Sequence, residues 1–350
     1  MAAAALLIGC GADKPAAAAQ HSVTAPQPRS ESRTFRDWRA VCDNGNECVA
    51  FGPASEGVGW IRVGASPGPE GATSVSVGLW PAEDEAPVES VALELDGRGY
   101  VARSGQGSEA FGVAAGDASS LVAGLAAGSV MTVRAGGRSQ GVSLTGAAAA
   151  LLWIDERQGR LNTVAALVRR GNRPASMIPA PPALPVVTPA PPVDQTGYGD
   201  SGQTLPAALE ALPAVRACRE ETSQSDWVQR EVMSARLDDA TELWAVPCFM
   251  GAYNIGHDWY LTDRGGRNPR ALALPSANGE TATGTINGGY APETRTLTAF
   301  AKGRGIGDCG TAQTWTWTGR AFLLTAESEM QDCWGVPADL WPTTWRTRES

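Results

Sequence analysis

A proline-rich run at residues 173–194, which includes Pro181-Pro182 and Pro191-Pro192, divides this chain. Proline has no amide hydrogen to donate and holds φ near −65°, so neither a helix interior nor a central strand continues through such a run. A polyproline-like segment instead extends by about 3.1 Å per residue and acts as a spacer. We therefore predict an inter-domain linker over residues 173–195. A docking site for a proline-reading partner within it is the alternative.

The stretch before this run shows short apolar segments separated by Gly, Pro, Asp or Glu, which is typical of β-strands. Asn44-Gly45 predicts a tight hairpin turn because glycine accepts positive φ, and the hairpin brings Cys42 close to Cys48. Two short helices are expected, one over 117–128 and one over 147–157 with Thr145 as its cap and Gly159 as its stop. We predict a β-rich domain over residues 34–172.

The stretch after the run repeats the β pattern. It predicts a helix over 205–212, with Pro206 tolerated in the first turn. Alternation over Thr314–Thr318 places Trp315 and Trp317 on one face of a strand, and Gly319 marks a hairpin. The expected fold is therefore mainly β with a few short helices. It comprises two antiparallel β-rich domains joined by a Pro-rich linker, the second being a disulfide-stapled, Trp-rich domain over residues 196–350.

Leu7-Ile8-Gly9-Cys10 near the start fits the bacterial lipobox, in which the cysteine takes lipid. Residues 1–10 are therefore expected to be a lipoprotein signal segment, Cys10 the lipid attachment site, and residues 11–33 a flexible tether. Each methylene of the acyl chains adds about 0.8 kcal/mol of membrane affinity. No Lys or Arg precedes the apolar run, and the run is short for a signal peptide, so an ordinary cysteine near the start is the alternative. Gly11 favours transport to the outer membrane.

Six cysteines remain once Cys10 is set aside, an even number that suits an oxidising compartment. Six cysteines allow 15 connectivities, of which we favour the sequential one. Its pairs are Cys42 with Cys48, Cys218 with Cys248, and Cys309 with Cys333. The expected location is the cell envelope, with the chain facing the periplasm or at the outer membrane. A net charge of −9 argues against nucleic acid as a partner, and no apolar run approaches the ~20 residues of a spanning helix.

The catalytic motifs in the chain are weak. Gly64-Ala-Ser66-Pro67-Gly68 matches a nucleophile pattern, but Pro67 has no N–H to offer an oxyanion hole. His21 lies in the expected tether, which leaves His257 as the one histidine of a folded region, and a strand-start histidine is its simpler interpretation. Two histidines exclude a multi-histidine zinc site, and no Cys-x-x-Cys pair occurs among the six cysteines.

The remaining candidate ligand loops also lack the right spacing. Glu83-Asp84-Glu85 and Asp238-Asp239 do not have the spacing of a calcium loop. Gly303–Gly307 is glycine-rich, but no strand-to-helix junction accompanies it, so we predict a β-turn pinned by Cys309. We therefore predict no catalytic residue, no metal and no cofactor.

Tryptophan gives the most suggestive signal for a ligand. Eight of the 12 tryptophans fall in the second stretch, where they either fill a small core or stack on sugar rings. The candidate ligand-binding residues are Trp259, Trp315, Trp317, Asn254, Arg304 and Asp308.

Two family resemblances accompany these patterns. Phe35–Trp38, Cys42, Cys48 and Ser143–Ala147 resemble the invasion-associated locus B family, a group of exported bacterial proteins. The stretch from Phe35 to Trp345 resembles more closely the domain-of-unknown-function family 1176. The residues that carry this second resemblance are Trp38, Cys42, Cys48, Asp155–Gly159, Val246–Asn254, Lys302–Gly310 and Trp317–Phe322. That family has no established activity, so the resemblance implies export and a two-part plan.

The expected function is that of a non-enzymatic, exported envelope lipoprotein that binds a protein or glycan partner. The alternative is a cell-wall glycan hydrolase or transglycosylase that uses paired carboxylates, which must lie about 5–9.5 Å apart. Asp258, Asp263 and Asp308 are the acids that the second domain offers for such a pair.

Overall fold

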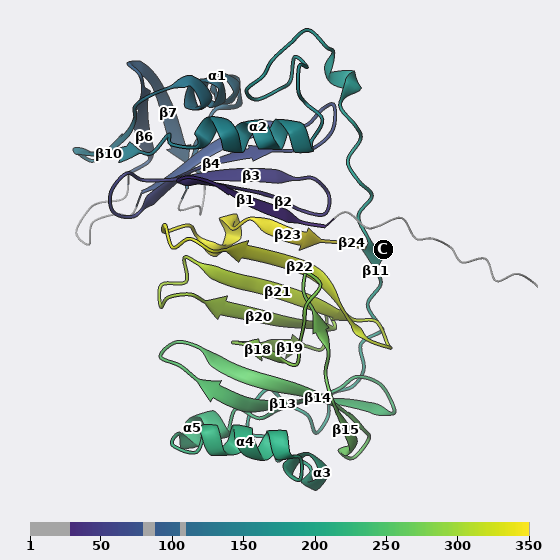
Figure 1. Ribbon diagram of the computed structural model, residues 1–350. Helices are drawn as coiled ribbons and strands as arrows, with labels where there is room; N and C mark the ends of the chain where they lie inside the picture. The colour runs from purple at the N-terminus through teal and green to yellow at the C-terminus, as the bar shows by residue number, and fades with distance from the viewer. Residues whose placement is uncertain (1–28, 80–87, 106–109, 350) are drawn as a thin grey trace, which may run out of the picture.

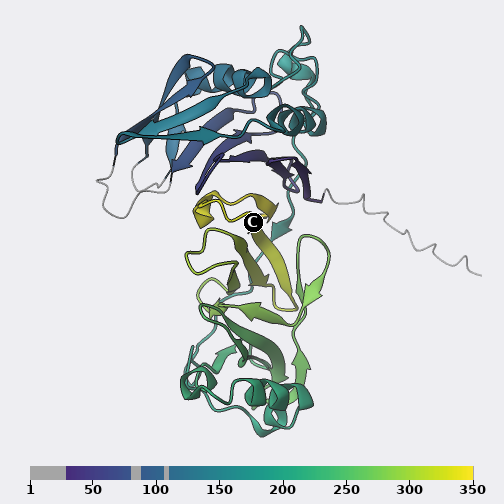
Figure 2. The same ribbon diagram turned by 60° about the vertical axis from the view of Figure 1, so that its left-hand side comes forward.

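The structure, a computed structural model, describes residues 29–79, 88–105 and 110–349. These residues form a column of stacked β-sheets with helices at its two ends (Figures 1 and 2). The fold is mainly β with short helices, as expected. Cys10, His21 and the acidic cluster Glu83-Asp84-Glu85 lie outside the described residues, as do the signal segment and most of the tether.

The first half is built on one antiparallel ten-stranded sheet, in the order β1-β2-β3-β4-β5-β8-β7-β6-β9-β10. The Asn44-Gly45 turn joins β2 to β3, so the predicted hairpin is confirmed. The strands are β1 (Glu31–Phe35), β2 (Trp38–Cys42), β3 (Cys48–Pro53), β4 (Gly59–Ala65), β5 (Thr73–Leu79), β6 (Ser90–Leu95), β7 (Arg98–Ser104), β8 (Phe111–Val113), β9 (Met131–Ala135) and β10 (Arg138–Val142).

Two helices, α1 (Ala115–Ala127) and α2 (Ala147–Arg157), cover one face of this sheet (Figure 1). The buried side chains of α2 lie on one stripe and pack on that face. The prediction that Thr145 caps α2 is wrong, because the cap is Gly146 with φ +104° and no side-chain hydrogen bond. A Cβ at Gly146 would lie 1.7 Å from the Phe35 carbonyl oxygen, so only glycine fits there.

The second half contains two five-stranded antiparallel sheets. One has the order β12-β13-β14-β15 with β18 paired to β14, and the other has the order β19-β20-β21-β22-β23. Their strands are β12 (Met233–Arg236), β13 (Thr241–Met250), β14 (Ile255–Asp263), β15 (Arg267–Ala271), β18 (Gly284–Ile286), β19 (Gly289–Ala291), β20 (Thr296–Lys302), β21 (Gly310–Trp317), β22 (Phe322–Met330) and β23 (Thr343–Arg346). A small ladder joins β16 (Leu274–Pro275) to β17 (Thr281–Ala282).

Short helices close the far end of the column (Figure 1). They are α3 (Ala207–Glu210), α4 (Pro213–Glu221) and α5 (Asp226–Gln229). A 3₁₀ turn, η2 (Ala338–Leu340), comes elsewhere, just before β23 in the chain. The helix expected over 205–212 is shorter than predicted and begins after Pro206. A second proline at the first position of α4 starts a new helix, as its fixed φ and missing donor allow.

The two halves share a buried cluster. Strands β2 to β4 contribute apolar side chains to this cluster, and the second half packs against them. Its members are Val41, Val49, Phe51 and Trp60 of these strands, Met330, Val336 and Trp341 of the second half, and also Ala110 and Cys309. The opposite face of these strands packs under the helices, so β2 to β4 are buried on both sides. Polar contacts join the same surfaces, with Arg39 2.6 Å from Asp332. That residues 34–172 and 196–350 form two separate domains stays a prediction.

The proline-rich segment runs along one side of the column (Figure 1). It contains a 3₁₀ turn, η1 (Ala175–Met177), and β11 (Val186–Val187), which pairs in parallel with β24 (Arg348–Glu349). The Ala190 amide donates to the Trp317 carbonyl, 2.9 Å away, and Ile178 is buried. The segment is held along the surface of the two halves and does not stand as a free spacer, so the inter-domain linker stays a prediction.

Three disulfides are present, with the sequential pairing that the sequence favoured. Cys42–Cys48 crosses the β2–β3 hairpin, and Cys218–Cys248 ties α4 to β13. Cys309–Cys333 ties the start of β21 to the loop after β22. Among the described residues, no helix has both the length and the apolar character needed to cross a bilayer.

Candidate functional site

The three tryptophans proposed as ligand-binding residues lie in the core. Trp259, Trp315 and Trp317 are each at most 2% exposed and belong to the main apolar cluster of the second half. Two of the three indole N–H groups are satisfied internally, since Trp259 donates to Thr285 Oγ1 and Trp315 to the Pro275 carbonyl, whereas Trp317 Nε1 is buried without a partner. Stacking on a sugar needs an open ring face, so this burial favours core packing over ligand binding for these rings.

The polar candidates also have internal partners. Asn254 donates to the Lys302 carbonyl at 2.9 Å, and its Oδ1 accepts from Asn287. Arg304 forms an ion pair with Asp308, whose carboxylate also accepts the Gly335 amide at 2.7 Å. Burial tends to raise the pKa of Asp308, but these donors outweigh it and hold the pKa below its usual range. All three side chains fix loops, and Gly303–Gly307 forms the predicted turn.

Two of the three acids named for catalysis lie too far apart to form a pair. Asp258 and Asp263 lie five positions apart on β14, about 17 Å at the usual strand rise. Asp308 is ion-paired with Arg304 and nearly buried. Two groups of potential metal ligands exist among the described residues, but each consists of a disulfide and one aspartate, and bridged sulfurs are not thiolates.

His257 is a buried strand residue of β14, 5% exposed. Its Nε2 lies 3.1 Å from the Glu231 carbonyl oxygen. Burial lowers the pKa of His257 to about 4, so the ring is neutral near pH 7 and donates Nε2–H to that carbonyl. The strand histidine favoured by the sequence fits this position.

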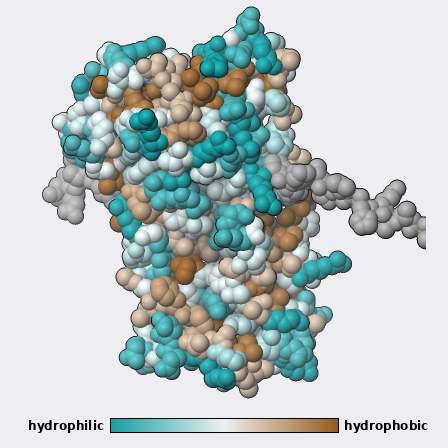
Figure 3. All heavy atoms as spheres, viewed as in Figure 1, coloured by the Kyte–Doolittle hydropathy of each residue, from teal (hydrophilic) through white to brown (hydrophobic). Residues whose placement is uncertain are grey.

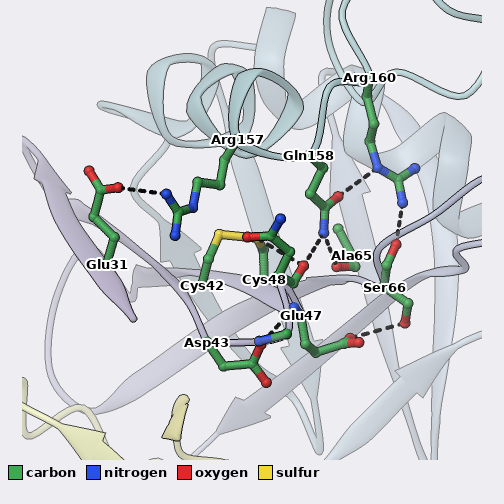
Figure 4. Close-up of a disulfide and its surroundings, with 12 residues drawn as sticks. Glu31, Cys42, Asp43, Glu47, Cys48, Ala65, Ser66, Arg157, Gln158 and Arg160 are labelled. Carbon is green, nitrogen blue, oxygen red and sulfur yellow. Dashed lines mark hydrogen bonds and ion pairs between the residues drawn. A yellow bond between two sulfur atoms is a disulfide. The ribbon is translucent and has the colours of Figure 1, made fainter. Parts of the chain in front are cut away.

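The Asp155–Gly159 motif forms a polar network between the end of α2 and the Cys42–Cys48 hairpin (Figure 4). Gln158 donates to the carbonyls of Asn46 and Ala65, both at 2.7 Å, and accepts from Arg160 Nε at 2.6 Å. Asp155 accepts the amides of Leu167 and Val168. These polar groups are nearly all satisfied by one another, so the motif locks α2 to the hairpin.

Ser66, of the rejected nucleophile pattern, belongs to the edge of this network. Its hydroxyl donates to Glu47 Oε1 at 3.0 Å, and its carbonyl accepts from Arg160 (Figure 4). Ser66 therefore has a carboxylate partner that holds a loop in place.

The other two motifs of the resemblance, Val246–Asn254 and Lys302–Gly310, meet in space. Tyr253 Oη donates to the Gly303 carbonyl at 3.1 Å, and Asn254 binds the main chain of Lys302. A Cβ at Gly305 would lie 3.5 Å from the Tyr253 ring, an ordinary van der Waals distance, so the ring lies against this loop. The tip of the β13–β14 hairpin and the β20–β21 loop thus form one surface.

This surface carries large apolar side chains that face solvent. Phe249, Met250, Tyr253 and Ile306, which we call the Tyr253 surface, are 46%, 44%, 41% and 57% exposed. A register shift between Pro247 and Phe249 interrupts the β13–β14 pairing just before the tip of the hairpin. Cys248 directly precedes Phe249, and Cys309 follows the Gly303–Gly307 loop, so a disulfide anchors each segment.

The setting of the Tyr253 surface is unusual for this chain. Figure 3 shows one face of the molecule on which apolar residues form small scattered patches among polar ones. Four of the 11 large hydrophobic side chains that are exposed among the described residues belong to the Tyr253 surface. Sequence reasoning named both motifs as carriers of the family resemblance and interpreted Gly303–Gly307 as a turn, but nothing in either motif shows that they meet.

Comparisons with known proteins support the second of the two family resemblances, and the resemblance to the invasion-associated locus B family is not shown. The family profile described as "Protein of unknown function (DUF1176)" matches residues 32–348. "Uncharacterized protein YpfG" of Escherichia coli (strain K12) is 30% identical over 334 residues, which cover 90% of this chain and 93% of that protein. No solved structure matches the chain significantly.

Proposed function

We propose that this chain, which belongs to the DUF1176 family of proteins of unknown function, is a non-enzymatic cell-envelope lipoprotein that binds a polypeptide partner. The lipobox at Leu7–Cys10 supports the anchor. Three disulfides support an oxidising compartment, and so does the resemblance of Phe35–Trp38 and the first cysteine pair to the invasion-associated locus B family. The chain then faces the periplasm or lies at the outer membrane.

The observation that carries the binding role is the Tyr253 surface. Aromatic and methionine side chains held on rigid loops are what protein interfaces use as anchors. Met250 and Ile306 have no flat face to offer a sugar ring, so a polypeptide fits this surface better than a glycan does. Burial of such side chains yields about 1.5–3 kcal/mol each, enough for a few to dominate a complex.

Site-specific photo-crosslinking in intact cells tests the binding role. A benzophenone amino acid replaces Phe249 or Ile306 in the full chain, and a control carries it at Val101, which is 42% exposed in the first half. The proposal expects one discrete protein adduct from positions 249 and 306 that is absent from 101 and is lost with Met250→Ser. The same adducts from all three positions, or no adduct at all, would overturn it.

Metabolic labelling with an alkyne fatty acid tests the anchor separately. The full chain should incorporate the label, and Cys10→Ser should abolish it while the three disulfides still form. An unlabelled product with reduced cysteines would exclude both the lipoprotein and its compartment.

The alternative function is a glycan hydrolase or transglycosylase. One observation favours it: burial raises the pKa of the Asp258 carboxyl, as a general acid requires. Incubation of the full chain with purified peptidoglycan tests it. Release of soluble fragments that disappears with Asp258→Asn and persists with Asp226→Asn, an exposed acid of α5, would favour the enzyme over the binding module.

A further inference from the structure

A cleft of about 420 Å³ opens in the second half, away from the Tyr253 surface. Three segments far apart in the sequence line it: Gln195–Asp200, Met233–Ala235 of β12, and Tyr290–Glu293, with Trp259 of β14 as a further lining residue. Gly199 and Ser234 exchange two main-chain hydrogen bonds, so the first segment is fixed against β12. The volume lies in the range of pockets that hold small molecules.

The walls of the cleft are aromatic, and their polar ends point elsewhere. Tyr198 donates its hydroxyl to Glu242 at 2.8 Å, and Trp259 donates its indole N–H to Thr285 at 2.7 Å. The Tyr290 hydroxyl is buried although the residue as a whole is half-buried, and its ring packs edge-on against Phe322. Tyr198 and Tyr290 are half-buried and leave carbon surface for a ligand, whereas Trp259 is 1% exposed and adds little.

The two charged residues that line the cleft are acidic, and Arg236 and Arg264 act on Tyr198 from outside the lining. Asp200 and Glu293 are exposed lining residues, and neither has a hydrogen bond or ion pair with the described residues. The lining contains no lysine, arginine or histidine. Arg295, two positions beyond Glu293, is 1% exposed and donates to the carbonyls of Leu237 and Arg236, so its charge is used inside the fold.

We propose that this cleft binds an organic cation that carries an ammonium or guanidinium group. The carbon part of this cation rests on the Tyr198 and Tyr290 rings. Cations are attracted to aromatic faces by about 0.5–2 kcal/mol. The two unpaired carboxylates of Asp200 and Glu293 add attraction for the same charge and repel anions. Nothing in this proposal depends on the Tyr253 surface, which shares no residue with the cleft.

Calorimetric titration of the purified full chain tests the site. The probes are N-acetyl-arginine amide, its neutral isostere N-acetyl-citrulline amide, and spermidine. The two cations distinguish a basic side chain of a polypeptide from a free polyamine, and the site is expected to bind at least one of them. Binding should be saturable for the cation, absent for the citrulline compound, and weaker at high salt, because exposed charges are screened.

Matched variants assign the binding to the cleft. Glu293→Gln and Asp200→Asn should each weaken it by about two- to fivefold, the range for exposed ion pairs. Glu210→Gln on α3 removes the same charge outside the lining and should leave affinity unchanged. An unchanged melting temperature establishes that the variants fold. Equal binding of arginine and citrulline compounds, an undiminished affinity in the Asp200/Glu293 double variant, or no binding of either cation would overturn the proposal.

Discussion

Trp60 Nε1 donates a hydrogen bond to the carbonyl oxygen of Gly335, 3.1 Å away, although 275 positions separate the two residues. The indole belongs to β4 of the first sheet, and the carbonyl belongs to the loop that the Cys309–Cys333 bridge holds. Around this bond lies the apolar cluster shared by both halves. The junction is therefore a packed interior.

The first prediction concerns this junction. Trp60→Ala should lower the free energy of unfolding by about 3–5 kcal/mol, the usual cost of truncating a buried aromatic residue. Because the cluster is shared, both halves should lose stability. Denaturant unfolding followed by circular dichroism measures this. Trp227→Ala, at a 57% exposed position on α5, is the control and should change stability by less than about 0.5 kcal/mol.

The second prediction concerns the Gln158 network. Gln158→Leu leaves the Asn46 and Ala65 carbonyls without this donor and Arg160 Nε without its acceptor, so it should cost about 2 kcal/mol or more. Glu156→Ala, an exposed position on the same helix, should cost much less. Equal midpoints of urea unfolding for the two variants would contradict a structural role for the network.

The third prediction is a pH dependence. In the folded chain the pKa of His257 is about 4, below the 6.5 of an unfolded chain, so above pH 6.5 both states are neutral and the residue has no effect. Between pH 6.5 and 4 the unfolded state binds the proton and the folded state does not, so stability falls. The full effect is roughly 3 kcal/mol. Denaturant unfolding over this range should show a smaller loss in His257→Gln, and parallel curves would exclude the mechanism.

The fourth prediction ranks the disulfides. The bridged cysteines lie 6, 30 and 24 positions apart for Cys42–Cys48, Cys218–Cys248 and Cys309–Cys333. In the chain-entropy model the short loop contributes about 2 kcal/mol and the two longer loops about 3.5 kcal/mol each. Double-serine variants, compared by thermal melting, should therefore lose least stability when the first pair is removed. Serine variants of a longer pair that melt above those of the first pair would contradict the ranking.

The fifth prediction separates binding from stability. Phe249→Ser combined with Ile306→Ser removes two exposed side chains, so the melting temperature should stay nearly constant. The crosslink from position 250, tested with the same benzophenone amino acid, should disappear. A large loss of stability would mean that the Tyr253 surface is part of the core.

Local chemistry in the sequence predicted much of the fold. The Asn44-Gly45 turn, the turn at Gly319 and most strands follow from residues that are neighbours in the chain. The cysteine pairing also followed, because each bridge joins cysteines that are consecutive along the described chain. The cap of α2 was missed because a close approach by Phe35, over 100 positions away, selects Gly146.

The candidate sites could not be predicted in the same way. The contact of Tyr253 with Gly303 and the three-segment lining of the cleft depend on sheet packing, which a single sequence does not encode locally. The ligand-binding role predicted for the tryptophans rested on composition, which shows that rings are present. Burial decides whether a ligand can reach them, and burial depends on the same packing. The β11–β24 pairing could not be predicted because it joins the proline-rich segment to a strand that lies much later in the sequence.

The shared cluster also bears on how the protein is made. A ribosome adds about 5–20 residues per second, so roughly 15–55 s pass between the synthesis of Trp60 and that of Gly335. Throughout that interval the outer face of β2 to β4 has no cover for its valines and aromatic rings. A nascent first half therefore needs a chaperone, or must stay unfolded, until its own carboxyl-terminal residues arrive.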